Sequence, residues 1–451
     1  MGKIFKAVPI YNLNQCLFFH PNQNKLNDQT NQTTIIHFGL QKMEATCKIL
    51  NTLKENEIGL STTIMDKLQL PLGVDYEISV QNDGMIIGPF IGLLVAETQA
   101  ELKEKIIYHT RIIKQYPFVK GVIVLFAWEG IDQKTNMITG YIYNPTSQKW
   151  ENGIIPFPAV VVKKQMILST KRQRYLKSLY GSRFFNSAYI NKWKMHNLLS
   201  LNEDILPHLP KTFLYEEPLD ILKYLKKFQT VYVKPLSGLK GRGVEKFIVE
   251  PNKFCVKFRK NTENLAIEFF SEKDLLNYVE TKFISKKYII QEGLNIEIEK
   301  NHLIDFRIVL IKDQSGQWQD VGMVGKKGVE ESVVSNLSSG GKVEPAISLL
   351  STAFQLSEPE VVNTRKKMSE VAISVAKEID KYETICNFGI DIALDKNHHI
   401  WLIEVNHISP NNNMFSLIGD DDTVTKIRDA SIFYAKYLAG FPKVNRNEQS
   451  K

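Results

Sequence analysis

The sequence predicts an α/β (α+β) protein with more than one folding unit. Short apolar runs alternate with segments of helical periodicity, and glycine and proline separate them. The longest apolar runs have the length of a strand, well below the ~18 residues that a membrane helix needs. At roughly 150 residues per domain, the 451 residues have room for about three domains.

The composition is that of a globular protein with a sizeable core, because hydrophobic residues make up 43% and charged residues 24%. The net charge of +8 permits an anionic ligand but does not argue for nucleic acid. The 4 cysteines have no metal-finger spacing, so we expect reduced, mostly buried thiols. Without a membrane or lipidation signal, we expect a cytoplasmic protein.

The first 185 residues divide into two expected units. Residues 1–90 hold short apolar segments with Gly and Pro between them, which predicts a β-rich N-terminal unit. In residues 91–185, a strand at 91–95, a helical segment at 99–116 and a strand at 121–126 predict a β-α-β unit with a parallel sheet. Residues 138–143 and 158–163 are expected to add further strands.

A basic and aromatic segment at 171–190 has two interpretations. Such a composition can bind nucleic acid. It can equally form a surface helix and linker between domains, which we favour because the run is short and isolated.

The rest of the chain is expected to form one domain at 186–442, followed by a polar tail at 443–451. Its strands are predicted at 231–233, 288–291 and 306–311, and its helices at 192–200 and 361–381. The apolar positions of the longer helix are Val362, Met368, Val371, Ala372, Val375 and Ile379.

Two apolar runs, 388–395 and 400–406, flank a four-residue polar turn and predict a β-hairpin. A symmetric turn with Asp395 opposite Ile400 places Asp391 opposite Glu404, with Asn406 on the same face. The other face would be an apolar stripe of Ile390, Ile392, Leu394, Trp401, Ile403 and Val405.

Opposed carboxylates destabilise a sheet unless a cation lies between them. Carboxylate and amide oxygens suit Mg²⁺, which takes one or two carboxylates together with substrate phosphates. The alternative is a pair of solvated carboxylates on an exposed face. A turn of odd length would turn one set of side chains over and remove the site.

A strand that ends in Lys234 leads into a loop with Gly238, Gly241 and Gly243. Glycines let backbone N–H groups approach phosphate, and a lysine supplies a point charge. The loop is neither a Walker A motif nor a Rossmann fingerprint, so a plain basic turn is the alternative.

The order of these motifs resembles the ATP-grasp superfamily, and within it the YheC/YheD-type endospore coat-associated proteins. The resemblance extends from Lys192 to Pro410 and rests on the order of the motifs more than on any single motif. The motifs are Lys192 at a helix start, Val233-Lys234-Pro235 with its glycine loop, Asp305-Phe306-Arg307, Ser335-Asn336-Leu337 with Gly340-Gly341, Asp391, and Glu404-Val405-Asn406. One departure is Asn191 where relatives often have Asp, and we expect little effect from it.

The resemblance implies an ATP-grasp fold in which two α+β subdomains clasp ATP. A β-rich N-terminal unit and a small parallel-sheet pre-ATP-grasp domain would precede it. It also implies binding residues for ATP: Lys192 and Lys234 for the phosphates, Gly238, Gly241 and Gly243 in a covering loop, Gln291, Glu292 and Leu294 at the adenine hinge, and Asp305 at the nucleotide.

The resemblance further implies catalytic and metal-binding residues. Arg307 and Asn336 would lie near the transferred phosphoryl group and the acceptor. Mg²⁺, as two ions, would be held by Asp391, Glu404 and Asn406.

The implied activity is an ATP- and Mg²⁺-dependent carboxylate–amine (or thiol) ligase that forms an acylphosphate and is linked to spore formation. The alternative is a non-catalytic nucleotide-binding structural protein of the spore coat. Expected partners are ATP, unidentified carboxylate and amine substrates, and spore coat proteins. Neither a membrane nor nucleic acid is expected as a partner.

Overall fold

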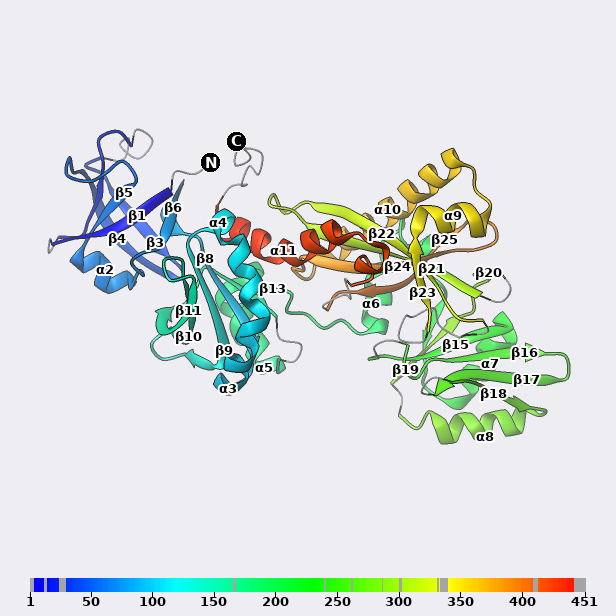
Figure 1. Ribbon diagram of the computed structural model, residues 1–451. Helices are drawn as coiled ribbons and strands as arrows, with labels where there is room; N and C mark the ends of the chain where they lie inside the picture. Colours follow the sequence, from blue (N-terminus) through cyan, green and yellow to red (C-terminus); the bar gives the residue numbers. More distant parts are fainter. Residues whose placement is uncertain are drawn as a thin grey trace.

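The computed structural model describes residues 4–11, 14–23, 30–164, 168–238, 241–260, 263–285, 287–299, 302–330, 332, 340–408 and 413–441. The chain forms two halves (Figure 1). One half holds a barrel and a mixed sheet, the other holds two further sheets, and helix α11 (Asp421–Leu438) lies between the halves. This helix contacts β8 and β12 of the first half and β21, β22 and β24 of the second.

The N-terminal unit is a closed barrel in the order β1-β5-β2-β4-β3-β7-β6. Alternation along its strands turns apolar side chains such as Ile36 and Phe38 inward, where they are fully buried. Closure leaves no exposed strand edge. Its elements are β1 (Ile4–Ile10), β2 (Cys16–Phe19), β3 (Thr33–Phe38), β4 (Gln41–Ile49), β5 (Glu57–Ser61), α2 (Thr62–Leu68), β6 (Asp75–Gln81) and β7 (Gly84–Gly88).

The second unit is a six-stranded sheet in the order β11-β10-β9-β8-β12-β13. Strands β8 and β9 are parallel, so the predicted β-α-β unit is confirmed. The connection contains two short α-helices, α3 and α4, with a 3₁₀ helix, η1, between them. The elements are β8 (Phe90–Ala96), α3 (Gln99–Lys105), η1 (Ile106–Gln115), α4 (Tyr116–Val119), β9 (Val122–Asp132), β10 (Met137–Asn144), β11 (Lys149–Pro156), β12 (Val160–Lys163) and β13 (Phe184–Phe185).

The basic segment forms the surface helix α5 (Thr170–Tyr180). Arg172 pairs with Glu97 and lies 4.9 Å from the ring centroid of Trp128. Lys177 reaches Glu383 at 2.5 Å. These basic side chains therefore fasten the helix to its neighbours, as the surface-helix interpretation expects.

The second half contains two sheets that we name after the residues they carry. The lysine sheet carries Lys234 and has the order β14-β19-β15-β16-β17-β18. Side chains alternate along β15, so Val231 and Val233 pack against α7 and α8 whereas Tyr232 and Lys234 point the other way. Its elements are β14 (Thr212–Leu214), α7 (Pro218–Phe228), β15 (Thr230–Pro235), β16 (Glu245–Glu250), β17 (Lys253–Lys260), β18 (Glu263–Phe269), α8 (Glu272–Lys282) and β19 (Tyr288–Glu292).

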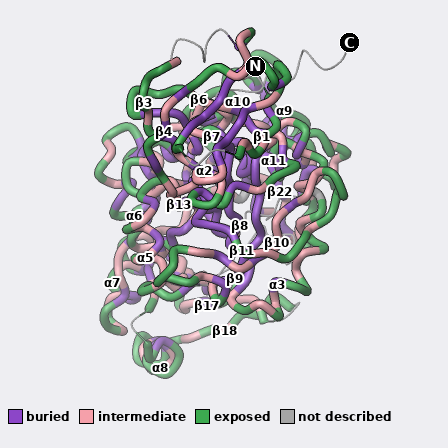
Figure 2. Tube along the Cα trace, turned by 90° about the vertical axis from the view of Figure 1, so that its left-hand side faces the viewer, coloured by how far each residue is buried: buried purple, intermediate pink, exposed green. Residues whose placement is uncertain are grey.

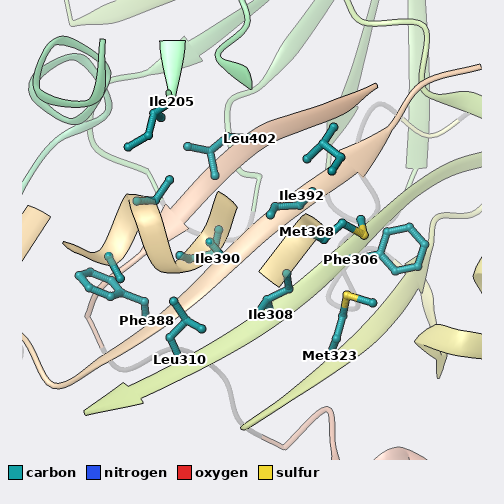
Figure 3. Close-up of a cluster of buried hydrophobic side chains, with 14 of the residues drawn as sticks. Ile205, Phe306, Ile308, Leu310, Met323, Met368, Phe388, Ile390, Ile392 and Leu402 are labelled. Carbon is teal, nitrogen blue, oxygen red and sulfur yellow. The ribbon is translucent and has the colours of Figure 1, made fainter. Parts of the chain in front are cut away.

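The carboxylate sheet carries Asp391 and Glu404 and has the order β23-β22-β21-β24-β25, with β20 paired to β21. Phe306, Ile308 and Ile390 belong to a core on one face (Figure 3), which α10 covers, and α11 packs on the opposite face. The elements are β20 (Glu297–Glu299), β21 (His302–Lys312), β22 (Trp318–Lys327), β23 (Lys342–Pro345), α9 (Ala346–Phe354), α10 (Glu358–Asp380), β24 (Asn387–Leu394) and β25 (Ile400–Asn406).

One core position predicted on helix α10 is wrong. Val362 is 62% exposed, and Val361 is buried in its place. Figure 2 shows the general pattern, in which central strands such as β8 and β9 are buried and the outer helix α8 is largely exposed. Within the described ranges, no helix combines the length and the apolar character needed to cross a membrane.

Candidate functional site

A cavity of about 220 Å³ lies between the lysine sheet and the carboxylate sheet, beside helix α6 (Lys192–Leu199). Apolar side chains, among them Met195, Leu199 and Leu294, line one part of it. Of the predicted site residues, the cavity is lined by Lys192, Lys234, Gly238, Gly241, Gln291, Glu292, Leu294, Asp305, Asp391, Glu404 and Asn406. Arg307 lies directly behind Asp391, and Asn336 lies outside the described residues.

The hairpin β24–β25 places Asp391 opposite Glu404, as predicted, but by a different register. The turn pairs Leu394 with Ile400, so an unbroken ladder would have set Asp391 opposite Ile403. A β-bulge between the Asp391 and Ile392 pairs takes up the extra residue and restores the opposed carboxylates.

Because of the bulge, the predicted apolar stripe is partly wrong on β25. Ile400 and Leu402 join Ile392 in the core, whereas Trp401 and Ile403 do not. The indole nitrogen of Trp401 donates to Asp395 at 3.0 Å. The side chains of β25 therefore change face at the bulge.

Asp391 is the centre of a buried polar network on the face of the carboxylate sheet opposite the core of Figure 3. Arg307 donates to both of its oxygens, at 2.6 Å through Nε and 2.8 Å through Nη2. Lys326 donates to Oδ1 at 2.9 Å, and Asn406 donates to Oδ2 at 3.2 Å through Nδ2. A carboxylate has about four lone-pair sites, so these four bonds use them all.

Electrostatics fix the charges of this network. Burial raises the pKa of Asp391, but Arg307 and Lys326 outweigh it and hold that pKa below its usual value. Burial lowers the pKa of Lys326, but Asp305 and Asp391 outweigh it, so that pKa is raised. The Asp305 carboxylate lies 2.9 Å from the Lys326 ammonium. Asp391, Lys326 and Arg307, whose pKa is also raised, therefore stay ionised near neutral pH.

Glu404 is more open than Asp391, since its side chain is 37% exposed against 4%. It pairs with Lys192, the first residue of α6. Asn191 caps this helix, accepting from Lys194 N at 2.9 Å. The departure at Asn191 thus keeps an N-cap oxygen, and the cap sets where Lys192 enters the cleft.

On the other wall, Lys234 donates to Gln291 Oε1 at 2.5 Å. Burial lowers its pKa to about 8, an effect that Glu404 counters and Lys192 strengthens. Gln291 belongs to β19, which ends at Glu292 and leads into Gly293 and Leu294. A Cβ on Gly293 would lie 2.4 Å from Thr230 Cγ2, so this turn needs glycine.

Comparison with known sequences decides the family. The sequence model of the YheC/D-like ATP-grasp family matches residues 181–438. The chain belongs to this family. It is 24% identical over 402 residues to the endospore coat-associated protein YheD of Bacillus subtilis (strain 168), covering 85% of this chain and 86% of that protein.

The chain is also similar to a second coat-associated protein and to a solved structure. The chain is 21% identical over 307 residues to the endospore coat-associated protein YheC of the same organism, covering 66% of this chain and 84% of that protein. Among solved structures, a D-alanyl-alanine synthetase A from Vibrio cholerae has 13% identity and a TM-score of 0.41, with 77% of this chain and 98% of that chain covered.

Lys326 and His407 are among the site residues of this YheC/D-like ATP-grasp chain that were not predicted. Lys326 is 1% exposed and lies opposite Asp305 in the β21–β22 hairpin. A count outward from the turn at 313–317 would have set Gly325 opposite Asp305, because the register shifts by one residue between the Val309 and Leu310 pairs. His407 accepts from Ile190 N at 3.0 Å, and burial lowers its pKa to about 4, so a neutral imidazole holds the segment before α6.

The donor atoms on the carboxylate sheet fit the magnesium that ATP-grasp proteins use. Asn406 turns its Nδ2 toward Asp391, which leaves its oxygen on the side away from that carboxylate. Glu404 is accessible, whereas Asp391 can accept a cation only if Arg307, Lys326 or Asn406 gives up a bond. No cluster of three His, Cys, Asp or Glu side chains suited to a metal occurs in the part of the chain that is described. Mg²⁺ commonly takes one or two protein carboxylates and completes its shell with water and phosphate.

Proposed function

We propose that this chain is an ATP- and Mg²⁺-dependent ligase-like enzyme that joins a carboxylate to an amine, or to a thiol, through an acylphosphate. The observation that carries the proposal is the charge arrangement of one cleft. Lys192 and Lys234 line it, Arg307 and Lys326 lie beneath it, and Glu404 is the accessible carboxylate. A triphosphate needs cations on one side and a carboxylate-held metal on the other.

The nucleotide would lie along the cleft with its base near the hinge. Gln291, Glu292 and Leu294 would meet adenine, where the lining is partly apolar. Asp305 would contact the nucleotide near its ribose. The phosphates would extend toward the two lysines, under a loop with Gly238, Gly241 and Gly243, of which Gly243 has a φ of +74°.

The reaction would have two steps. A carboxylate oxygen of the first substrate bonds to the γ-phosphorus while the bond to the β–γ bridging oxygen breaks, and ADP leaves. The amine nitrogen then bonds to the acyl carbon, phosphate leaves, and the nitrogen loses a proton to solvent. Bound Mg²⁺ would neutralise charge that develops on the phosphate oxygens.

The residues of this chain would act by position and charge. Lys192 and Lys234 orient the triphosphate, and Arg307 and Lys326 add positive potential from the floor of the cleft. Asp391 fixes both of those cations. Glu404 and Asn406 would hold the metal, with Asp391 as the third predicted ligand, and Asn336 would lie near the acceptor.

The second candidate function is a non-catalytic, nucleotide-binding structural protein of the spore coat. The names of YheD and YheC, which describe those proteins as endospore coat-associated, favour it. On either candidate we place the chain at the endospore coat, with coat proteins as partners. The division into units at 1–90, 91–185 and 186–442 also belongs to this proposal, with the site in the last unit.

Thermal unfolding with Mg-ATP tests the site. A ligand that binds only the folded state at about 100 times its Kd adds ~2.7 kcal/mol of stability. We expect such a rise for the unaltered chain and its loss in Glu404→Gln, because the accessible metal ligand is weakened. Glu370→Gln, on an exposed helix face, is the matched control.

A second measurement separates the two candidates. ADP release is followed while mixtures of carboxylates and amines are added to the chain with Mg-ATP. Stimulated release supports the ligase. Stabilisation by Mg-ATP without any stimulated release supports the structural protein, and no stabilisation at all contradicts both.

A further inference from the structure

A chain of hydrogen bonds crosses three neighbouring strands of the lysine sheet and ends at the cleft. Lys234 Nζ on β15 donates to Gln291 Oε1 on β19 at 2.5 Å. Gln291 Nε2 donates to Thr212 Oγ1 on β14 at 3.0 Å. The Thr212 hydroxyl donates to the carbonyl oxygen of Pro210 at 2.9 Å. A side chain of the proposed adenine hinge is therefore bonded to the lysine of the phosphate end.

The donors and acceptors permit one orientation of the Gln291 amide. An ammonium only donates, so the amide oxygen must face Lys234. Thr212 has one hydroxyl hydrogen, which it gives to Pro210, so it accepts from the amide nitrogen. The opposite rotation would set an NH₂ group against the ammonium. The orientation follows from the bonding pattern and not from a choice between similar atoms.

The surroundings of Lys234 restrict it further. Tyr232 lies opposite Gln291 in the sheet register, and the Lys234 ammonium lies 5.4 Å from the Tyr232 ring centroid. A lysine side chain has four rotatable bonds and loses entropy when a ligand fixes it. A contact that fixes the ammonium beforehand reduces that loss on binding.

We propose that Gln291 is a positioning residue for Lys234, with Thr212 locking the Gln291 amide, so that the hinge strand prepares the phosphate end of the site. The inference rests on the proposed nucleotide site and deepens it. It gives Gln291 a task that does not depend on which base the nucleotide carries.

The base-independent task can be separated from base reading with a ligand that has no base. Inorganic tripolyphosphate with Mg²⁺ presents the phosphates alone. If Gln291 acts through Lys234, replacing Gln291 lowers the affinities for tripolyphosphate and for ATP by a similar factor. If Gln291 only contacts adenine, the affinity for ATP alone falls.

The experiment is calorimetric titration of the full chain with Mg-ATP and with Mg-tripolyphosphate. Gln291→Met keeps the length of the side chain and removes its hydrogen bonds. We expect about a tenfold loss of affinity for both ligands, the order of a hydrogen bond to a charged group. Thr212→Val should give a smaller loss of the same kind, because Lys234 keeps its partner. Gln319→Met, an exposed strand glutamine on the other sheet, is the matched control and should change neither affinity.

A double-mutant cycle gives an independent answer from ATP alone. In a Lys234→Met background, Gln291→Met should cause no further loss, because the contact through which it acts is gone. An equal loss in both backgrounds, or a loss confined to ATP with tripolyphosphate unchanged, overturns the inference while leaving the nucleotide site intact. If the unaltered chain binds neither ligand, the proposed function itself fails and takes the inference with it.

Discussion

The two walls of the cleft hold their positive charges in different ways. On the carboxylate sheet, Arg307 and Lys326 are almost fully buried and are bonded to the carboxylate of Asp391. On the lysine sheet, Lys234 is bonded to the neutral amide of Gln291. A buried cation with an anionic partner belongs to the fold, since removing either member leaves a buried charge. A cation with a neutral partner can be removed at less cost, so its charge serves mainly the ligand.

The pKa shifts show the same contrast. Burial lowers the pKa of both lysines, but Asp305 and Asp391 outweigh it for Lys326, whose pKa is raised. For Lys234, Glu404 offsets burial only in part, and the pKa falls to about 8. The charge of the carboxylate sheet is therefore independent of pH near neutrality, and the charge of Lys234 is not.

The largest expected effect is on folding stability. Arg307→Met leaves the buried Asp391 without its bidentate partner, so we expect a loss of about 3–5 kcal/mol in the free energy of unfolding. Lys234→Met removes a cation that has no anionic partner among the described residues, so we expect a change of about 1 kcal/mol or less. Denaturant unfolding of the two variants measures the difference.

Lys366→Met supplies the control, because Lys366 and Glu370 form an exposed pair on α10 and such pairs contribute about 0.2–1 kcal/mol. Equal losses for Arg307→Met and Lys234→Met would erase the distinction between the walls. A small loss for Arg307→Met would mean that Lys326 and Asn406 satisfy Asp391 without it.

The hairpin shows how much of the site could be read from the sequence. The apolar runs and the polar turn predicted the strands, and the opposed Asp391 and Glu404 are confirmed. The turn is one residue longer than assumed, and without a bulge this would have paired Asp391 with Ile403. The bulge adds one residue on β25 and restores the pairing with Glu404. Counting along a sequence cannot place a bulge, because packing of both strands against the rest of the sheet determines it.

Contacts between residues far apart in the sequence could not be predicted from local patterns, for a related reason. The helix α10 has a clear apolar periodicity, and its bounds were predicted to within a few residues. The burial of Lys326 depends on Asp305 and Asp391, which belong to two other strands. Nothing in the local sequence around Lys326 marks it as buried, since lysine is usually exposed.

The next effect in size concerns pH. Lys234 binds phosphate in its charged form, so affinity for Mg-ATP is fully present below its pKa of about 8 and is lost as pH rises through that value. Glu404 and Lys192, the charged groups that act on it, contribute with opposite signs. We expect about a tenfold loss of affinity between roughly pH 7 and pH 9.5, where most of the charge is gone.

Calorimetry in buffers of different ionisation enthalpy checks the sign directly. Binding favours charged Lys234, so near pH 8 to 9 the complex should take up a proton. The alkaline loss and the proton uptake should both disappear in Lys234→Met. If they persist there, the titrating group is another one and the contrast between the walls does not rest on Lys234.

The smallest expected effect tests the pair that joins α6 to the carboxylate sheet. Lys192 occupies Glu404, the accessible carboxylate, so a divalent cation without nucleotide must compete with its ammonium. Lys192→Met removes the competitor, and we expect binding of Mn²⁺ alone to strengthen by up to about fivefold, the worth of a partly exposed ion pair. The same variant should weaken Mg-ATP, because the phosphates lose a cation. Lys194→Met removes an equal charge from an exposed position on the same helix and should change neither affinity.

Opposite changes in the affinities for the metal and for the nucleotide would mean that Lys192 pairs with Glu404 until a bound phosphate attracts the Lys192 ammonium away. A fall in both affinities would mean that Glu404 does not bind the metal, and the carboxylate sheet would then serve the fold alone.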